Sequence, residues 1–328
     1  DKKVTLRLSI SLAVAIIALV WFGASQPPVR ADKGVSYRMI DGAGDVLLNV
    51  AEAGKKGAPG LLLIHGNGQS SLSWHRQLKS DLAEEFHLVA YDLRGHANSG
   101  KPWDIESYNR ACIWAEDIAA VIRETGLENP ILVGWSRGGL MVMHYVRCFG
   151  TEALSGIAMV SSRGRLVDVP LPSSDSPARM SQVQLEDQNI ESNIAGADTF
   201  AGLMTANPMD EEWVAISKAM NVMSPPYARR AMRSPVYGPD GMVNNSYANL
   251  IAQIDVPFLA VMGDQDPFRD SSQLAAAFAS ALPHAQILIY SGVGHSPFLE
   301  QPRRFNADLK AFALDAFAAH SSRTQTEQ

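Results

Sequence analysis

Short apolar runs alternate with amphipathic segments along most of the chain. Eight runs have the length and the Val, Ile and Leu content of buried strands. We expect strands at residues 36–40, 46–51, 61–65, 87–91, 130–135, 156–161, 257–263 and 286–290. Apolar residues at helical spacing predict helices at residues 72–85, 109–125, 137–149, 271–282 and 302–318. Such alternation predicts an α/β fold with a mostly parallel sheet flanked by helices, preceded by an antiparallel pair of strands.

The alternation of strand and helix is interrupted once, in the second half of the chain. Residues 164–250 contain no strong strand pattern, but they are rich in Met and Pro and include helical windows at 209–223 and 226–233. We therefore expect a helical insertion there. The α/β core would comprise residues 35–163 and 251–320, followed by a disordered polar tail at residues 321–328.

A glycine-rich turn follows the fifth predicted strand. Gly134-Trp135-Ser136-Arg137-Gly138 lies between an apolar run and a helical segment. In this setting the G-x-S-x-G pattern predicts a nucleophile elbow, in which the serine has a strained backbone and the glycines prevent collisions. The N-terminus of the following helix would offer N–H groups to an oxyanion. Ser136 is therefore the candidate nucleophile.

A serine nucleophile needs a base and a carboxylate that orients the base. His295 follows the last predicted strand, within Gly294-His295-Ser296-Pro297, and two acids, Asp264 and Asp266, follow the strand at 257–263. Open α/β sheets place their sites at the carboxyl ends of strands, where all these candidates lie. The chain order is Ser, Asp, His.

These motifs resemble those of the α/β-hydrolases, in particular the capped serine esterases and haloperoxidase-like enzymes. The similarity extends from about residue 35 to about residue 318. It depends on the elbow, the Asp and His loops, a strand ending in His65-Gly66-Asn67-Gly68, and a block at 91–100. The block is similar to the family pattern D-x-R-G-x-G-x-S, with Ala97 where glycine is usual. The resemblance implies an eight-stranded sheet and a helical cap formed by the insertion.

The resemblance also implies roles for individual residues. Asp266 is favoured as the acid because it fits the family pattern strand-Gly-x-x-Asp, whereas Asp264 is favoured as a turn or cap residue. The backbone N–H groups of Asn67 and Arg137 would form the oxyanion hole. His65 would be architectural, as would His96.

The function implied is hydrolysis of carboxylic esters through an acyl-enzyme on Ser136. Relatives with other chemistry carry Asp at the elbow, so serine indicates acyl transfer. We expect a small-molecule substrate, a small or medium hydrophobic ester or lactone, and no cofactor. Alternatives are a cofactor-free haloperoxidase-like perhydrolase, a C–C bond hydrolase, and a slow-turnover ligand receptor of the same fold.

Substrate contacts are predicted from residues near the motifs. Trp74 and Trp135 could form walls of an acyl pocket. The guanidinium group of Arg137 could bind a substrate carboxylate or pair with an acid of the insertion, and the sequence favours neither alternative. Seven methionines of the insertion could line an apolar pocket or pack the insertion onto the core: Met180, Met204, Met209, Met220, Met223, Met232 and Met242.

Charge and composition exclude some function classes. The formal net charge is −6 with a pI near 5.8, and no basic stripe stands out, so nucleic acid is not an expected partner. The histidines show no HxH or HxxxH spacing, so we predict no metal site.

The first 31 residues have the pattern of a targeting segment. Three basic residues precede an uncharged apolar stretch at 8–22, which small residues and prolines follow. We expect an exported enzyme, periplasmic or secreted, with membrane association through this segment as the alternative. Cys112 and Cys148 fall in predicted helices, and we expect two buried free thiols.

Overall fold

The computed structural model describes residues 34–238, 241, 243 and 246–326. Its strands form one eight-stranded sheet in the order β1-β2-β4-β3-β5-β6-β7-β8. Their bounds are β1 (Val35–Asp41), β2 (Leu47–Ala53), β3 (Gly60–Ile64), β4 (His87–Tyr91), β5 (Ile131–Trp135), β6 (Gly156–Val160), β7 (Phe258–Gly263) and β8 (Gln286–Tyr290). β2 pairs antiparallel with β1 and β4, and the other pairs are parallel. The predicted fold class is confirmed.

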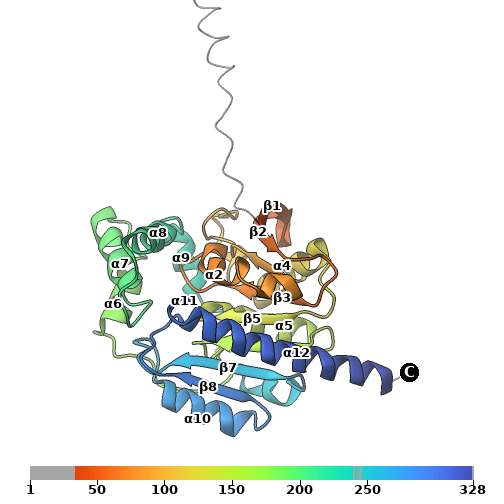
Figure 1. Cartoon of the computed structure of the whole chain (residues 1–328). Coiled ribbons are helices and arrows are strands. Elements are labelled where there is room, and N and C mark those ends of the chain that lie inside the picture. The colour runs from red at the N-terminus through yellow and green to blue at the C-terminus, as the bar shows by residue number, and fades with distance from the viewer. Residues whose placement is uncertain (1–33, 239–240, 242, 244–245, 327–328) are drawn as a thin grey trace, which may run out of the picture.

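Helices cover both faces of the sheet (Figure 1). They are α2 (His75–Leu78), α3 (Leu82–Glu85), α4 (Ala111–Thr125), α5 (Arg137–Phe149), α10 (Ser271–Ala281), α11 (Pro297–Glu300) and α12 (Pro302–Thr326). Successive strand residues point to opposite faces. In β5, Leu132 packs into the core shared with α4 and α5, whereas Val133 packs into the core shared with α12. β5 is therefore buried on both sides, which is why its sequence is continuously apolar.

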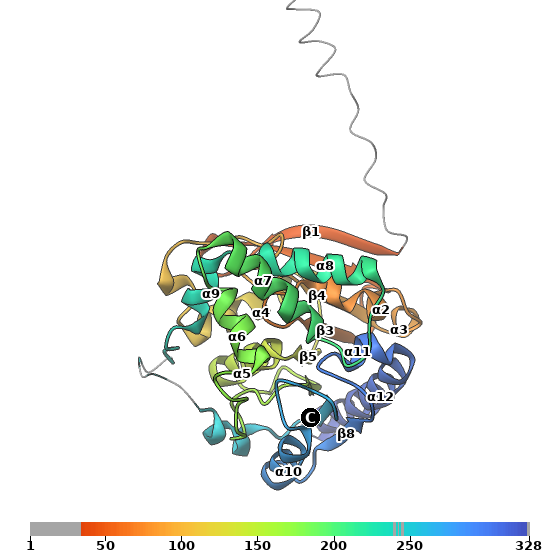
Figure 2. The ribbon, with the colours of Figure 1, turned by 90° about the vertical axis from the view of Figure 1, so that its left-hand side faces the viewer.

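The described residues between β6 and β7 contain four α-helices and a 3₁₀ helix at Ala248–Gln253. The α-helices are α6 (Pro177–Gln184), α7 (Ile190–Gly202), α8 (Glu211–Val222) and α9 (Pro226–Arg233). They lie together beside the sheet in Figure 1, and Figure 2 looks directly onto them. The first three begin at the side-chain caps Ser176, Asn189 and Asp210, each of which accepts a backbone N–H of the first turn.

The helix expected over residues 72–85 is broken into three short pieces: a 3₁₀ turn at Ser71–Trp74, then α2 and α3. Ser80 lies at the break, where its Oγ donates to Gln77 O at 2.8 Å and accepts from Leu82 N at 3.3 Å. A serine side chain that bonds to the local backbone competes with the helical hydrogen bonds, so the helix ends and restarts here.

The C-terminal tail corrects another expectation. α12 continues to Thr326 rather than ending at residue 318, so residues 321–326 are helical and not disordered. The tail contains no Gly or Pro, and Ser321 Oγ and Ser322 Oγ donate to carbonyls one turn earlier, at 3.0 Å each. Polar composition without a helix breaker therefore does not end this helix.

The N-terminal prediction lies outside the described residues. The structure describes nothing of residues 1–31, for which the sequence predicts a signal peptide or a membrane anchor. Among the residues that it does describe, no helix is both long enough and apolar enough to be a candidate membrane span.

The two cysteines are not free thiols, contrary to our expectation. Cys112 in α4 and Cys148 in α5 form a disulfide, with their Cα atoms 5.7 Å apart. The two helices pack side by side on the same face of the sheet, which brings the first turn of α4 next to the last turn of α5. That separation lies in the range that a disulfide requires.

We expect reduction of this disulfide to lower the free energy of unfolding by about 3–4 kcal/mol. The bridge joins residues separated by 36 positions, and closing a loop of that length restricts the unfolded chain. Urea unfolding with and without dithiothreitol measures the loss. A Cys112→Ser/Cys148→Ser variant is the control, because dithiothreitol should not change its stability. Equal stability of the oxidised and reduced wild type would contradict the prediction.

Candidate active site

Ser136 occupies a strained turn between β5 and α5. Its φ of 52° and ψ of −113° are unfavourable for a residue with a Cβ. The neighbouring glycines are sterically required: a Cβ on Gly134 would lie 2.6 Å from Gly139 Cα, and one on Gly138 would lie 2.2 Å from Ile64 O. The turn therefore has the steric features of a nucleophile elbow.

Hydrogen bonds from the adjacent strand hold Ser136 in this conformation. Ser136 N donates to Val160 O at 2.8 Å, and Ser162 Oγ donates to Ser136 O at 2.6 Å. On the other side, a Cβ on Gly66 would lie 3.1 Å from Ser136 Cβ. The loop after β3 therefore passes directly against the serine.

His295 and Asp266 are joined by a short hydrogen bond. His295 Nδ1 lies 2.7 Å from Asp266 Oδ2, and both side chains are almost fully buried. Asp266 Oδ1 also accepts from Phe268 N at 2.8 Å, which fixes the orientation of the carboxylate. The ring of Phe268 lies 4.5 Å from the imidazole ring, so the histidine is packed as well as hydrogen-bonded.

Asp264 has different surroundings. It is exposed, and its carboxylate accepts from Ser291 Oγ at 3.1 Å and from Gly292 N at 2.7 Å. The hydrogen bonds from Ser291 and Gly292 lower the pKa of Asp264, against the opposing effect of desolvation. Of the two candidate acids, the structure brings only Asp266 to the histidine.

The two tryptophans proposed for substrate binding lie in the core. Trp74 is fully buried and stacks on Phe298 at 4.2 Å, and neither Trp74 nor Trp135 lines the cavity at Ser136. Trp135 instead donates from Nε1 to His295 O at 2.8 Å. The residue that precedes the serine therefore holds the backbone of the histidine in place.

A cavity of about 240 Å³ opens at Ser136 and extends beneath the insertion. Asn67 and Arg137 line it together with the serine. Arg137 is the first residue of α5, so its N–H has no carbonyl of a preceding turn to bond to. The two residues chosen for the oxyanion hole and the serine thus share one cavity.

The remaining lining is more polar than the methionine content of the insertion suggests. Of the seven methionines, Met204, Met220 and Met232 are buried in the protein core, and Met242 lies outside the described residues. Apolar lining comes from Leu140, Leu171, Pro172, Ala178 and Phe268, whereas six lining residues are arginines.

The guanidinium group of Arg137 packs against the insertion. Its Nη2 donates to Met232 O in α9 at 2.5 Å. The pKa of Arg137 is lowered to about 10, mainly by burial and also by the nearby Arg165 and Arg233, whereas Glu186 of the insertion opposes the shift. The side chain therefore lies close to an acid of the insertion and also faces the cavity.

Comparisons with known proteins identify the family. A model of the alpha/beta hydrolase fold matches residues 59–302, about three quarters of the chain. The chain belongs to the α/β-hydrolase family. A bifunctional esterase/perhydrolase of Acinetobacter calcoaceticus is 25% identical over 270 residues, covering 79% of this chain and 93% of that protein. A non-heme chloroperoxidase of Kitasatospora aureofaciens is 24% identical over 259 residues, covering 77% and 91%.

Solved structures agree with this assignment. An esterase from Rhodococcus sp. ECU1013 superposes with a TM-score of 0.70 at 28% identity, covering 85% of this chain and 98% of that chain. The α/β-hydrolase described here is an enzyme of that fold, similar to esterases and haloperoxidases, as the sequence motifs predict.

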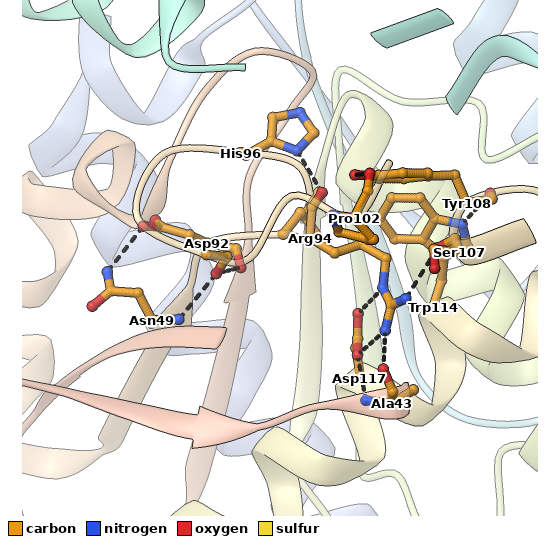
Figure 3. Close-up of polar contacts among 12 residues, drawn as sticks. Ala43, Asn49, Asp92, Arg94, His96, Pro102, Ser107, Tyr108, Trp114 and Asp117 are labelled. Carbon is orange, nitrogen blue, oxygen red and sulfur yellow. Dashed lines mark hydrogen bonds and ion pairs between the residues drawn. The ribbon is translucent and has the colours of Figure 1, made fainter. Parts of the chain in front are cut away.

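The Asp-Leu-Arg-Gly-His block of this hydrolase is structural (Figure 3). Asp92 accepts from Ser71 N at 2.7 Å and from Asn49 Nδ2 at 2.9 Å, which fastens the loop before α2 to β2. Ala97 has a φ of 37°, in the left-handed region that favours glycine. That conformation explains why glycine is usual at this position.

The two histidines near the site are also architectural in this hydrolase. His65 Nε2 accepts from Leu93 N at 2.9 Å, so its Nδ1 is the atom that donates to Gly66 O. His96 lies 5.1 Å away, ring to ring, in the same buried layer. Burial lowers the pKa of both imidazoles, which keeps them neutral at pH 7.

Arg94 of the same block makes a buried ion pair. Its Nε and Nη2 donate to the two carboxylate oxygens of Asp117 at 2.7 Å each, and both side chains are at most 1% exposed (Figure 3). We expect Asp117→Asn to lower the free energy of unfolding by about 3–5 kcal/mol, because it leaves a buried guanidinium without its counter-charge. Urea unfolding followed by circular dichroism measures this.

The matched control is Asp315→Asn, which removes an exposed carboxylate of α12. It should change stability by no more than about 0.5 kcal/mol. A loss below about 1 kcal/mol in Asp117→Asn would show that the pair contributes little to this fold.

Sequence reasoning missed several residues of the site. A short polar cluster directly after β6 consists of Ser162, Arg163 and Arg165. Within it, Ser162 Oγ donates a hydrogen bond to the carbonyl oxygen of Ser136. The signal was the run Ser161-Ser162-Arg163-Gly164-Arg165 at the carboxyl end of a strand, the same position that identified the aspartate and histidine loops.

Proposed function

We propose that this hydrolase cleaves carboxylic esters with Ser136 as nucleophile, His295 as general base and Asp266 as the acid that orients it. The observation that supports this most strongly is the buried hydrogen bond of 2.7 Å between His295 Nδ1 and Asp266 Oδ2. It leaves Nε2 as the imidazole atom that can accept the serine proton. The strained backbone of Ser136 is the second support.

In the proposed reaction, His295 takes the proton of the Ser136 hydroxyl while its oxygen attacks the ester carbonyl. The tetrahedral intermediate collapses when His295 gives that proton to the leaving alcohol. A water molecule, deprotonated by the same imidazole, then attacks the acyl-enzyme and releases the carboxylic acid and the free serine. Asp266 stabilises the imidazolium that forms in each half-reaction.

The oxyanion would be stabilised by the backbone N–H groups of Asn67 and Arg137. Both residues line the cavity, and the loop after β3, which contains Asn67, lies against Ser136 at Gly66. Loss of one such donor costs on the order of 10²–10³ in rate. Since both donors are backbone groups, side-chain substitution at Asn67 affects the rate only through loop geometry.

We propose that the insertion, residues 164–250, acts as a cap over the site. α9 is attached to the core: Tyr227 OH donates to Lys101 O at 2.8 Å, and Ser224 Oγ just before it donates to Gly95 O at 2.9 Å. Arg179 and Gln182 of α6 contribute to the cavity that holds Ser136. The insertion therefore supplies part of the wall that a substrate would touch.

Turnover of p-nitrophenyl esters of graded acyl length tests the proposal. Sustained turnover, with labelling of the enzyme by a fluorophosphonate, supports a serine esterase. A burst of one equivalent without further turnover would instead favour the slow ligand receptor. Absence of both turnover and labelling would refute the proposed chemistry.

Perhydrolysis is a second candidate, because the Acinetobacter calcoaceticus relative is a bifunctional esterase/perhydrolase. Hydrogen peroxide would replace water in attacking the acyl-enzyme, which gives a peracid from the same intermediate. Peroxide-dependent bromination of monochlorodimedone in acetate buffer is the assay. A rate that persists after loss of Ser136 would exclude this route.

We also propose that the enzyme functions outside the cytoplasm. The basic and apolar pattern of residues 1–31 supports export, and a disulfide between Cys112 and Cys148 fits an oxidising compartment. Fractionation of producing cells, with N-terminal sequencing of the recovered enzyme, distinguishes a cleaved signal peptide from a retained membrane anchor. Recovery in the cytoplasm with reduced thiols would overturn the proposal.

A further inference from the structure

Arginines gather around the cavity at Ser136. They come from α5, from the segment after β6, from α6, from α9 and from the loop after β7. We call the following lining residues the arginine cluster: Arg137, Arg163, Arg165, Arg179, Arg233 and Arg269. Glu186 is the acidic residue among the described lining. The cavity is therefore strongly positive although the whole chain has a net charge of −6.

Among the residues that the structure describes, carboxylates form ion pairs with two arginines of the cluster. Arg233 pairs with Glu186 at 2.9 Å, and Arg163 lies 3.5 Å from the fully exposed Asp168. Arg137 and Arg269 donate to backbone carbonyls, which carry no net charge. Like charges held together without matching acids are costly, and an anionic ligand would remove that cost.

Two buried guanidinium atoms of the cluster have unused hydrogen-bonding capacity. Within the part of the chain that the structure describes, Arg137 Nε and Arg269 Nε are buried and have no hydrogen-bond partner. Buried polar groups without partners are uncommon in folded proteins. Burial lowers the pKa of both arginines, and the arginines nearby lower it further, whereas Glu186 raises that of Arg137 and Asp266 raises that of Arg269. The side chains that carry these two atoms both line the cavity at Ser136.

We propose that the substrate of this hydrolase is an ester that carries an anionic group, a carboxylate or a phosphate, and that the arginine cluster binds that group. The proposal rests on the proposed function, because it requires the ester carbonyl to lie at Ser136. Ser136 and the cluster line one cavity of about 240 Å³, which is smaller than the roughly 300–1,000 Å³ typical of ligand pockets. The ester and the anion therefore belong to one small molecule.

The cluster also explains how such a substrate would be selected. Guanidinium groups match the geometry of carboxylate and phosphate oxygens and remain charged at neutral pH. A positive cavity in an acidic protein attracts small anions locally, and the effect decreases as salt is added. Neutral esters lack this attraction. Of two esters that differ only in charge, the anionic one should therefore have the higher kcat/KM.

A set of three matched esters tests this. The first is the p-nitrophenyl monoester of trans-cyclohexane-1,4-dicarboxylic acid, whose free carboxylate is held away from its own ester. The second carries a phosphonate in place of that carboxylate, and the third a neutral primary amide. We expect at least one anionic ester to exceed the amide in kcat/KM by tenfold or more at low salt, and the preference to decrease severalfold in 0.5 M NaCl. Whichever of the two anionic esters, carboxylate or phosphonate, has the higher kcat/KM relative to the amide ester identifies the anion that the cluster prefers.

Variants link the preference to the cluster. Arg163→Gln and Arg179→Gln should each reduce the ratio of anionic to neutral kcat/KM about threefold to tenfold, and the double variant should reduce the ratio further. Arg303→Gln is the control, because it removes an exposed arginine of α12. It should leave the ratio unchanged.

The outcomes separate this inference from the proposed function. Normal turnover of all three esters at equal efficiency, or a preference that the double variant retains, overturns the inference alone. Failure of every ester, together with failure of fluorophosphonate labelling, overturns the proposed function. Calorimetry then decides independently of turnover: trans-cyclohexane-1,4-dicarboxylate should bind wild type at least tenfold more tightly than its diamide, and equal affinity would overturn the anion site.

Discussion

Ser136→Ala should lower kcat for p-nitrophenyl esters by a factor on the order of 10⁴–10⁶ and abolish labelling by fluorophosphonates. The substitution removes the atom that forms the acyl-enzyme, while the hydrogen bonds that hold the turn use the Ser136 backbone. The fold and the melting temperature should therefore change little. The residual rate would come from the oxyanion donors and substrate binding alone.

The control for this substitution is Ser272→Ala, at an exposed position of α10. It should leave both kcat and labelling unchanged. If Ser136→Ala retained more than about a tenth of the wild-type kcat, another nucleophile would have to carry the reaction, and the proposed mechanism would be wrong.

Asp266→Asn should lower kcat by a factor on the order of 10³–10⁴, with little change in KM. Asp266 Oδ1 accepts from Phe268 N, and an asparagine at this position would keep its own oxygen toward that N–H. Its NH₂ group would then face His295 Nδ1, where the carboxylate now accepts. The imidazole would have to carry its proton on Nε2, the atom that must accept the serine proton.

Asp264→Asn makes the same chemical change two residues away and is the matched comparison. Its carboxylate is exposed and contacts Ser291 and Gly292, so kcat should change by less than about threefold. The pH dependence of kcat/KM for the two variants gives a second measurement. If Asp264→Asn reduced turnover more than Asp266→Asn, the choice of acid would be reversed.

The sequence predicted the parts of this molecule that local chemistry determines. The central strands were recognisable because a buried parallel strand is apolar on both faces, as in Ile131–Trp135. The strained serine was recognisable because its turn requires glycines at fixed positions. Even the unusual Ala97 marked a real constraint, since its backbone has a positive φ.

Features that depend on packing between distant segments were not predictable in the same way. The disulfide requires α4 and α5 to lie side by side, which neither helix encodes alone. Trp74 is next to a motif in sequence, yet it packs under Phe298. The arginine cluster is spread from residue 137 to residue 269, so no sequence window contains it.

The hydrogen bond from Trp135 Nε1 to His295 O has a consequence for how this enzyme could diversify. It joins the end of β5 directly to the loop after β8, and it involves no residue of the insertion, residues 164–250. This hydrogen bond therefore links the strand that carries Ser136 to the loop that carries His295 without involving the insertion, whereas Asn207 Nδ2 of the insertion makes a separate hydrogen bond to Gly292 O of that loop at 2.8 Å. Exchange of the inserted helices for others would leave the Trp135 contact in place, so variants with a different insertion should still hold the serine strand and the histidine loop together at this point.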